Sequence, residues 1–238
     1  DKSLIKEGFT EKRGTYGYYH PEKRVIAQVK KQYSFNPHVL YSYIPKQTEK
    51  YPTFEKFPYI PLDFGVSYDA IDTYEKNNGG VYDPSTSQYP DDQQICFIAY
   101  KVTNNKQMKF RNYFLSYDNV NHKPLQMIGT MQEWNDMNLV YYEHNGEFFF
   151  TEEFSALVEK EGFKYIGKND DRRDVFVNES KGITLQVQFA HFSGADDPSL
   201  VLLMLPYHGS KNSTASYNKL LMDNHNKLYH KISFLTNR

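Results

Sequence analysis

The sequence predicts an α+β fold built mainly on antiparallel sheet, with a few helices and a diverged internal duplication. Residues 183–192 alternate apolar with polar or small side chains, and this period of two is typical of a half-buried strand. A helix-like stretch followed by glycine occurs twice, at Glu7-Gly8-Phe9 and at Glu161-Gly162-Phe163. Glycine is the preferred residue just beyond a helix C-terminus, so each motif predicts the end of a helix.

Further matches follow both glycine motifs in the same order. Residues 18–22 correspond to 175–179, residues 28–29 to 186–187, and the proline-bounded segment 37–45 to 198–206. Each copy is predicted to run helix, strand, turn, strand, turn, strand, which gives tandem αβββ repeats over residues 3–45 and 151–206. The alternative is that any two helix–hairpin–strand segments share glycine and proline at their boundaries.

The whole chain, residues 1–238, is expected to form a single compact unit. Between the first repeat (3–45) and the segment 151–238 lie two other segments, a Tyr/Pro-rich irregular insert over 46–92 and an antiparallel meander over 93–150. The insert's prolines disfavour regular strands, although a short helix is predicted around residues 66–76. In the meander, Asn145-Gly146 predicts a hairpin, because a type I′ turn needs positive φ at both central positions.

Two features of the segment 151–238 bear on how the sheet is packed. Residues 200–205 form a continuous apolar run, which predicts a strand in the middle of the sheet. Residues 214–232 carry apolar side chains at helical spacing and predict a C-terminal helix that covers the sheet. This layout resembles in architecture small secreted inhibitor and immunity-type binding proteins. The resemblance is one of layout, so it gives no residue a role.

Composition excludes several classes of function. The 28 Lys and Arg residues nearly balance the 29 Asp and Glu residues, which removes the broad attraction that nonspecific nucleic-acid binding needs. No apolar stretch approaches the roughly 20 residues of a membrane span. Cys96 is the single cysteine, so no intrachain disulfide or multi-cysteine zinc site can form. Because the chain begins at Asp1 without Met, we expect a secreted or periplasmic protein. A variant of this expectation is a protein that carried a lipid anchor before its N-terminus was trimmed.

Two groups of residues could support catalysis, one as a serine nucleophile with a histidine and the other as a metal site. His208 and Ser210 follow the apolar strand, but the G-x-S-x-G elbow that exposes a hydrolase serine is absent. His191, Asp196 and Asp197 carry ligand types that cations accept, although their spacing matches no known ligand pattern. Turn chemistry is the preferred explanation for both groups, because turns favour these residue types regardless of function. No phosphate-binding glycine loop is present, so no cofactor is expected.

Aromatic side chains offer the remaining chemistry, because rigid amphipathic rings are enriched at binding hot spots. The predicted binding residues are Tyr51, Tyr59, Tyr68, Tyr74, Tyr82, Tyr89 and Trp134. The alternative is that these rings form the core of a chain with few Leu and Ile residues.

The leading functional hypothesis is a non-enzymatic binding protein that engages another protein, with inhibitor or immunity function as its sharpest version. A hydrolase built on the His/Ser or His/Asp residues of 191–210 is one alternative. Carbohydrate binding through exposed Tyr and Trp side chains is the other.

Overall fold

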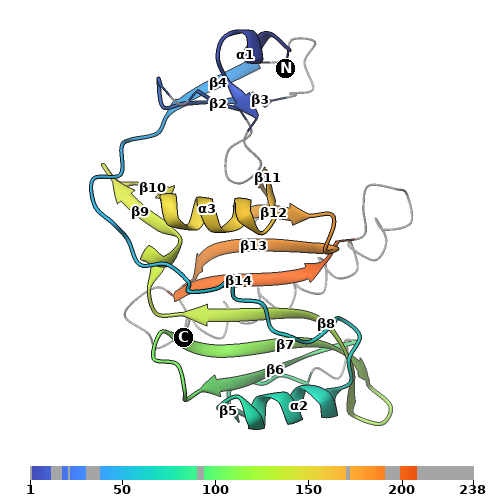
Figure 1. Ribbon diagram of the computed structural model, residues 1–238. Helices are drawn as coiled ribbons and strands as arrows, with labels where there is room; N and C mark the ends of the chain where they lie inside the picture. Colours follow the sequence, from blue (N-terminus) through green and yellow to red (C-terminus); the bar gives the residue numbers. More distant parts are fainter. Residues whose placement is uncertain are drawn as a thin grey trace. The chain divides into compact units, whose positions relative to one another are not determined.

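Antiparallel strands account for most of the regular structure, and the helices are few, as the sequence predicts (Figure 1). The computed structural model describes residues 2–11, 18–20, 22–30, 38–89, 94–169, 172–190 and 199–207. These residues form two compact units that each combine separate stretches of sequence. Unit 1 draws on residues 1–58 and 137–180, and unit 2 on residues 59–136 and 181–238. The single compact unit expected from the sequence stays a prediction.

Within its described residues, unit 2 contains one helix packed on a sheet whose neighbouring strands are all antiparallel. In order across the sheet the strands run β13, β14, β8, β7, β6 and β5. The element bounds are α2 (Tyr68–Asn77), β5 (Gly80–Tyr82), β6 (Ile95–Val102), β7 (Met108–Asp118), β8 (Lys123–Trp134), β13 (Ile183–Ala190) and β14 (Ser199–Pro206).

Two sequence predictions are met in this unit, and one strand was missed. The apolar run 200–205 lies in β14, which is paired on one side with β13 and on the other with β8. The predicted helix is α2, shifted by about two residues. The short strand β5 was not predicted, because it consists of three residues in the Tyr/Pro-rich segment and is fixed by pairing with β6.

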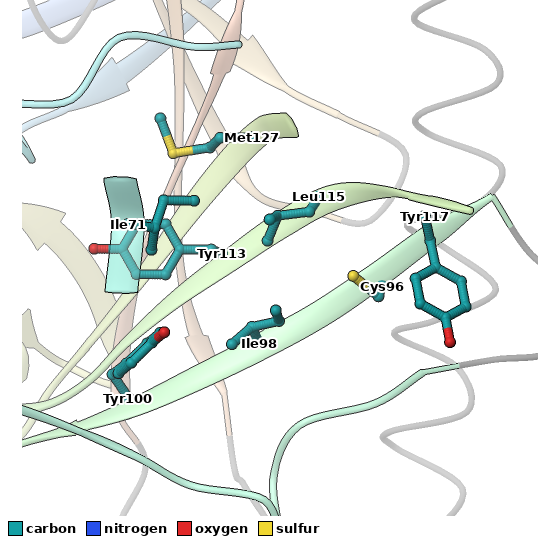
Figure 2. Packing of buried hydrophobic residues seen from close by; sticks show 8 residues of the cluster. All are labelled: Ile71, Cys96, Ile98, Tyr100, Tyr113, Leu115, Tyr117 and Met127. Carbon is teal, nitrogen blue, oxygen red and sulfur yellow. The ribbon is translucent and has the colours of Figure 1, made fainter. Parts of the chain in front are cut away.

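Both faces of the unit 2 sheet are buried, because successive side chains of a strand point to opposite faces. On β6, Ile95, Phe97 and Ala99 belong to one buried cluster with Met131 and Leu203. The alternate positions belong to a second cluster, which Ile71 of α2 joins. Figure 2 shows this second row along two neighbouring strands, with Cys96, Ile98 and Tyr100 on β6 and Tyr113, Leu115 and Tyr117 on β7.

Unit 1 holds the remaining described elements. Strands β1 to β4 form one antiparallel sheet in chain order, β9 pairs with β10, and β11 pairs with β12. The bounds are α1 (Lys2–Lys6), β1 (Thr10–Glu11), β2 (Tyr18–His20), β3 (Val25–Lys30), β4 (His38–Tyr43), a 3₁₀ turn (Met137–Leu139), β9 (Tyr141–His144), β10 (Glu147–Phe150), α3 (Glu152–Lys160), β11 (Lys164–Lys168) and β12 (Asp174–Asn178).

The hairpin predicted at Asn145-Gly146 is confirmed in this unit, and the start of α3 carries a second local signal. Asn145 and Gly146 have φ of 54° and 80° and connect β9 to β10. Thr151 caps α3 by accepting a hydrogen bond from the N–H of Phe154 at 3.1 Å. The core beside α3 is aromatic, since Phe150, Phe154 and Phe176 pack ring to ring.

The two predicted glycine caps have the same geometry. Gly8 and Gly162 have φ of 90° and 85°, in the left-handed region that favours glycine. Each helix end makes the same two capping bonds, namely Gly8 N to Ile5 O, Phe9 N to Leu4 O, Gly162 N to Glu159 O and Phe163 N to Val158 O. The helix termini are therefore confirmed, whereas the tandem repeats stay a prediction. The predicted closing helix, residues 214–232, lies outside the described residues.

Glu133 of β8 is a buried carboxyl, 4% exposed, on the same sheet face as Met131. Burial raises its pKa to about 7, against a hydrogen bond from Asn112 and the nearby Lys109 ammonium, which both lower it. The Asn112 amide donates to Glu133 Oε1 at 2.8 Å, while the buried Asn112 Oδ1 accepts no hydrogen bond from the described residues. A neutral Glu133 carries the hydroxyl donor that a carboxylate lacks, so protonation suits this environment.

We predict that Glu133 makes the protein less stable as pH rises from about 4.3 to about 7. In that range the folded chain holds a proton that the unfolded chain has released, so the free energy of unfolding falls by about 3 kcal/mol. Glu133→Gln should abolish this slope and exceed the wild type in stability at about pH 8. Urea unfolding at several pH values, followed by the fluorescence of the single tryptophan, Trp134, measures the effect.

The matched control is Glu147→Gln, because Glu147 is exposed. Its pH dependence should follow the wild type. An unchanged slope in Glu133→Gln would contradict the assignment.

Candidate functional site

The candidate site lies on the face of the unit 2 sheet that α2 covers, and α2 begins and ends with clear local signals. Ser67 caps the helix by accepting from the N–H of Ala70 at 3.4 Å. Asp72 and Lys76, one turn apart, form a surface ion pair at 2.5 Å. The buried positions are Ile71 and Glu75, again one turn apart. The helix therefore turns one apolar and one acidic side chain toward the sheet.

A buried ion pair fixes α2 to β7. Glu75 is fully buried and Arg111 is 7% exposed. The guanidinium donates from Nε to Oε1 at 2.7 Å and from Nη2 to Oε2 at 2.6 Å, and it also donates to the carbonyl of Asn78 at 2.8 Å. The Tyr113 hydroxyl donates to the same carboxylate. A bidentate pair with these extra hydrogen bonds satisfies the charges that burial has desolvated.

Gly80 allows β5 to pass directly over this ion pair. A Cβ atom at that position would lie 1.9 Å from Oε2 of Glu75. Only glycine fits there, because any side chain would displace the buried carboxylate. The start of β5, and with it the position of Tyr82, depends on the same pair.

Five tyrosines gather beyond the ion pair, and we call them the tyrosine cluster: Tyr68, Tyr82, Tyr89, Tyr100 and Tyr117. The Tyr82 and Tyr89 hydroxyls lie 3.0 Å apart and share a hydrogen bond. Each of these two rings contacts a buried ring, Tyr82 against Tyr100 at 6.0 Å and Tyr89 against Tyr117 at 5.9 Å between centroids. The Tyr100 hydroxyl donates to Asp72 at 3.2 Å, which ties the cluster to α2.

The hydroxyls of Tyr89 and Tyr100 stay protonated at physiological pH. Burial raises the pKa of Tyr89, and its hydrogen bond with Tyr82 raises it further. Burial likewise raises the pKa of Tyr100, followed by a hydrogen bond with Tyr68. Burial also raises the pKa of the Cys96 thiol to about 12, so it is not a thiolate nucleophile. The cluster therefore offers aromatic rings together with the neutral hydroxyls of Tyr89 and Tyr100, which suits binding.

A pocket of about 410 Å³ opens beside Tyr68. The N-terminal turn of α2, Ser116 of β7 and the start of β8 line it, and its polar side chains include Asp69, Lys123 and Gln126. Asp69 and Lys123 make no ion pair within the residues that the structure describes. Their charges are therefore available to a bound molecule.

The predicted binding tyrosines do not all meet. Tyr68, Tyr82 and Tyr89 do, whereas Tyr74 packs on Arg111, whose Cζ lies 5.7 Å from the ring centroid. Tyr59 lies beside Lys181, whose Nζ is 2.9 Å from the Tyr59 hydroxyl.

Tyr51 and Trp134 stand apart from the cluster. Tyr51 belongs to unit 1, where it stacks on Tyr142 at 5.6 Å. Trp134 is only 5% exposed, and its indole donates to Gln132 at 3.2 Å. A ring buried to this extent presents no surface for a ligand, so the candidate site does not include it.

The catalytic candidates His208 and Ser210 and the metal candidates His191, Asp196 and Asp197 lie outside the described residues. Where the structure describes the chain, no three His, Cys, Asp or Glu side chains group as metal ligands would. In the same part of the chain, no helix is long and apolar enough to cross a membrane.

Sequence reasoning did not select Tyr100 and Tyr117, or the ion pair that fixes α2. A signal for the tyrosines exists, because Tyr113, Leu115 and Tyr117 alternate along one strand and so share a face. No spacing rule links Glu75 to Arg111, because tertiary packing alone brings them together.

No protein-family model, curated protein or solved structure matches this chain, so its site is interpreted from geometry and chemistry alone.

We predict that Arg111→Met lowers the free energy of unfolding by about 3–5 kcal/mol, because it leaves the Glu75 carboxylate buried without its cation. The double variant Glu75→Leu/Arg111→Met should recover much of that loss, since no unpaired charge remains. Urea unfolding monitored by Trp134 fluorescence measures both values.

Lys76→Met is the control, because Lys76 is an exposed member of a surface pair and should change stability by less than about 1 kcal/mol. A double variant as unstable as the sum of both single variants would argue against a coupled buried pair.

Proposed function

We propose that the protein is a non-enzymatic binding protein that engages another protein through the tyrosine cluster. The observation that supports this most is the exposed tyrosine pair. Tyr82 and Tyr89 are each 38% exposed, while the rings behind them, Tyr100 and Tyr117, are 1% and 6% exposed.

Such a pair suits a protein partner because it is already ordered before binding. Each exposed ring packs on a buried ring, and the two hydroxyls hold each other. Ordering of side chains normally costs about 0.5–1.5 kcal/mol for each one immobilised at an interface. Rigid tyrosines avoid part of that cost and supply the large contact area typical of hot spots.

The finer version of this proposal is an inhibitor or immunity-type protein that acts after export, built from tandem αβββ repeats and a covering C-terminal helix. Two observations favour the repeats. Both predicted copies begin with a helix that ends in the same glycine cap, and both continue into antiparallel strands.

Carbohydrate binding is the second candidate function, and the pocket beside Tyr68 favours it. One aromatic ring and the side chains of Asp69, Lys123 and Gln126 border the same space, and such a combination can hold a sugar by ring contact and hydrogen bonds. A hydrolase using His208 and Ser210, or His191 with Asp196 and Asp197, stays a hypothesis. Substrate profiling with Ser210→Ala and His208→Ala tests it.

The leading proposal predicts that Tyr82→Ala/Tyr89→Ala weakens partner binding by at least about 100-fold, as loss of two hot-spot side chains would. Affinity capture from extracts and culture medium of the source organism, with quantitative mass spectrometry, identifies proteins retained by the wild type. Titration calorimetry with the purified partner then measures the loss of affinity.

Phe148→Ala serves as the matched control, since Phe148 is an aromatic side chain 48% exposed that belongs to unit 1. It should leave partner binding unchanged. Equal retention of every partner by the double variant and the wild type would refute the proposal. A glycan array that retains the wild type but not Tyr68→Ala would favour the carbohydrate function instead.

A further inference from the structure

The edge of the unit 1 sheet carries a second surface, separate from the tyrosine cluster. The four-stranded sheet runs β1, β2, β3, β4, so β4 is its last strand. All six residues of β4, His38–Tyr43, pair with β3 without a register shift. No strand within the described ranges pairs with the opposite side of β4. A regular strand edge of this length is a ready template for another strand.

The register identifies the backbone groups on that open side. Ile44 N donates to Arg24 O at 2.8 Å, so the pair 24–44 is a hydrogen-bonded pair of the ladder. Such pairs alternate with non-bonded ones along antiparallel strands. Residues 42, 40 and 38 therefore bond toward β3, and Val39, Tyr41 and Tyr43 direct their N–H and C=O groups outward.

The same three residues have exposed side chains. Val39, Tyr41 and Tyr43 are 41%, 52% and 62% exposed, and they share one face because they alternate along the strand. β4 contains no Lys, Arg, Asp or Glu, no proline and no bulge. It thus lacks the devices by which sheet edges usually avoid pairing.

We propose that β4 pairs antiparallel with β4 of a second copy of this chain, about a two-fold axis at Tyr41. In this register Tyr41 faces Tyr41 of the second copy, and Val39 faces its Tyr43. Val39, Tyr41 and Tyr43, whose backbone groups point outward, then each form a hydrogen-bonded pair with a residue of the second copy. The side chains form a cross-strand row of Val39, Tyr41 and Tyr43, which are strand-favouring types that stabilise such pairing.

A second copy fits this edge because a two-fold pairing brings each residue close to its own equivalent. A charged strand would repel itself in that arrangement, whereas β4 contains no Lys, Arg, Asp or Glu, and its His38 faces Ile44 of the second copy in this register. The assembly should stop at a dimer, because β1 at the other edge of the sheet comprises two residues in the described part of the chain, too few to pair regularly with a further strand. Two-fold self-association goes beyond the proposed partner binding, since it uses another surface in another unit.

Sedimentation velocity of the full chain, over concentrations up to about 1 mM, tests the pairing. The wild type should convert from monomer to dimer as concentration rises. Tyr41→Lys and Tyr41→Glu should each raise the dimer dissociation constant by at least about 10-fold, since like charges then face each other across the axis. An equimolar mixture of these two variants should dimerise again, because the introduced lysine of one copy would face the introduced glutamate of the other.

Ser42→Lys is the control, because it adds the same charge on the other face of β4 at a residue bonded toward β3. It should dimerise like the wild type, and circular dichroism checks that every variant is folded. A wild type that stays monomeric to about 1 mM overturns the proposal. So does a mixture that fails to associate, a Ser42→Lys variant as impaired as Tyr41→Lys, or growth beyond a dimer.

Discussion

The buried Glu75–Arg111 pair is the interaction on which the candidate site depends. It joins a helix to a strand that lies 36 residues away along the chain. Glu75 and Ile71 are the buried side chains of α2, so the pair and one apolar contact set the position of the helix over the sheet. Because a lone buried charge is far more costly than a paired one, the helix cannot shift without a large loss of stability.

From that pair the constraint extends outward to the surface. Gly80 brings β5 over the Glu75 carboxylate, and this places Tyr82 beside Tyr100. Asp72, on the same helix, accepts from the Tyr100 hydroxyl. The positions of the exposed tyrosines are thus fixed by their contacts with elements that the buried Glu75–Arg111 pair holds in place. A binding surface built in this way is ordered in the free protein, which lowers the entropic cost of association.

The opposite face of the same sheet follows a different electrostatic rule. There Glu133 has an amide neighbour but, among the described residues, no buried cation against it, and burial shifts its pKa upward. Two buried glutamates in one unit therefore have opposite consequences. Glu75 is held by two hydrogen bonds from the Arg111 guanidinium, whereas Glu133 is stabilised by protonation.

Much of the local structure was determined by the sequence alone, because caps, turns and strand alternation depend on neighbouring residues. The glycine caps at Gly8 and Gly162, the cap at Thr151 and the Asn145-Gly146 hairpin all depend on backbone geometry that few residue types satisfy. The tertiary structure decided which aromatic rings became surface and which became core. Tyr82 and Trp134 are equally plausible binding residues in the sequence, yet strand register exposes the first and buries the second. Register and helix position depend on contacts between distant residues, such as Glu75 with Arg111, and no local pattern encodes such contacts.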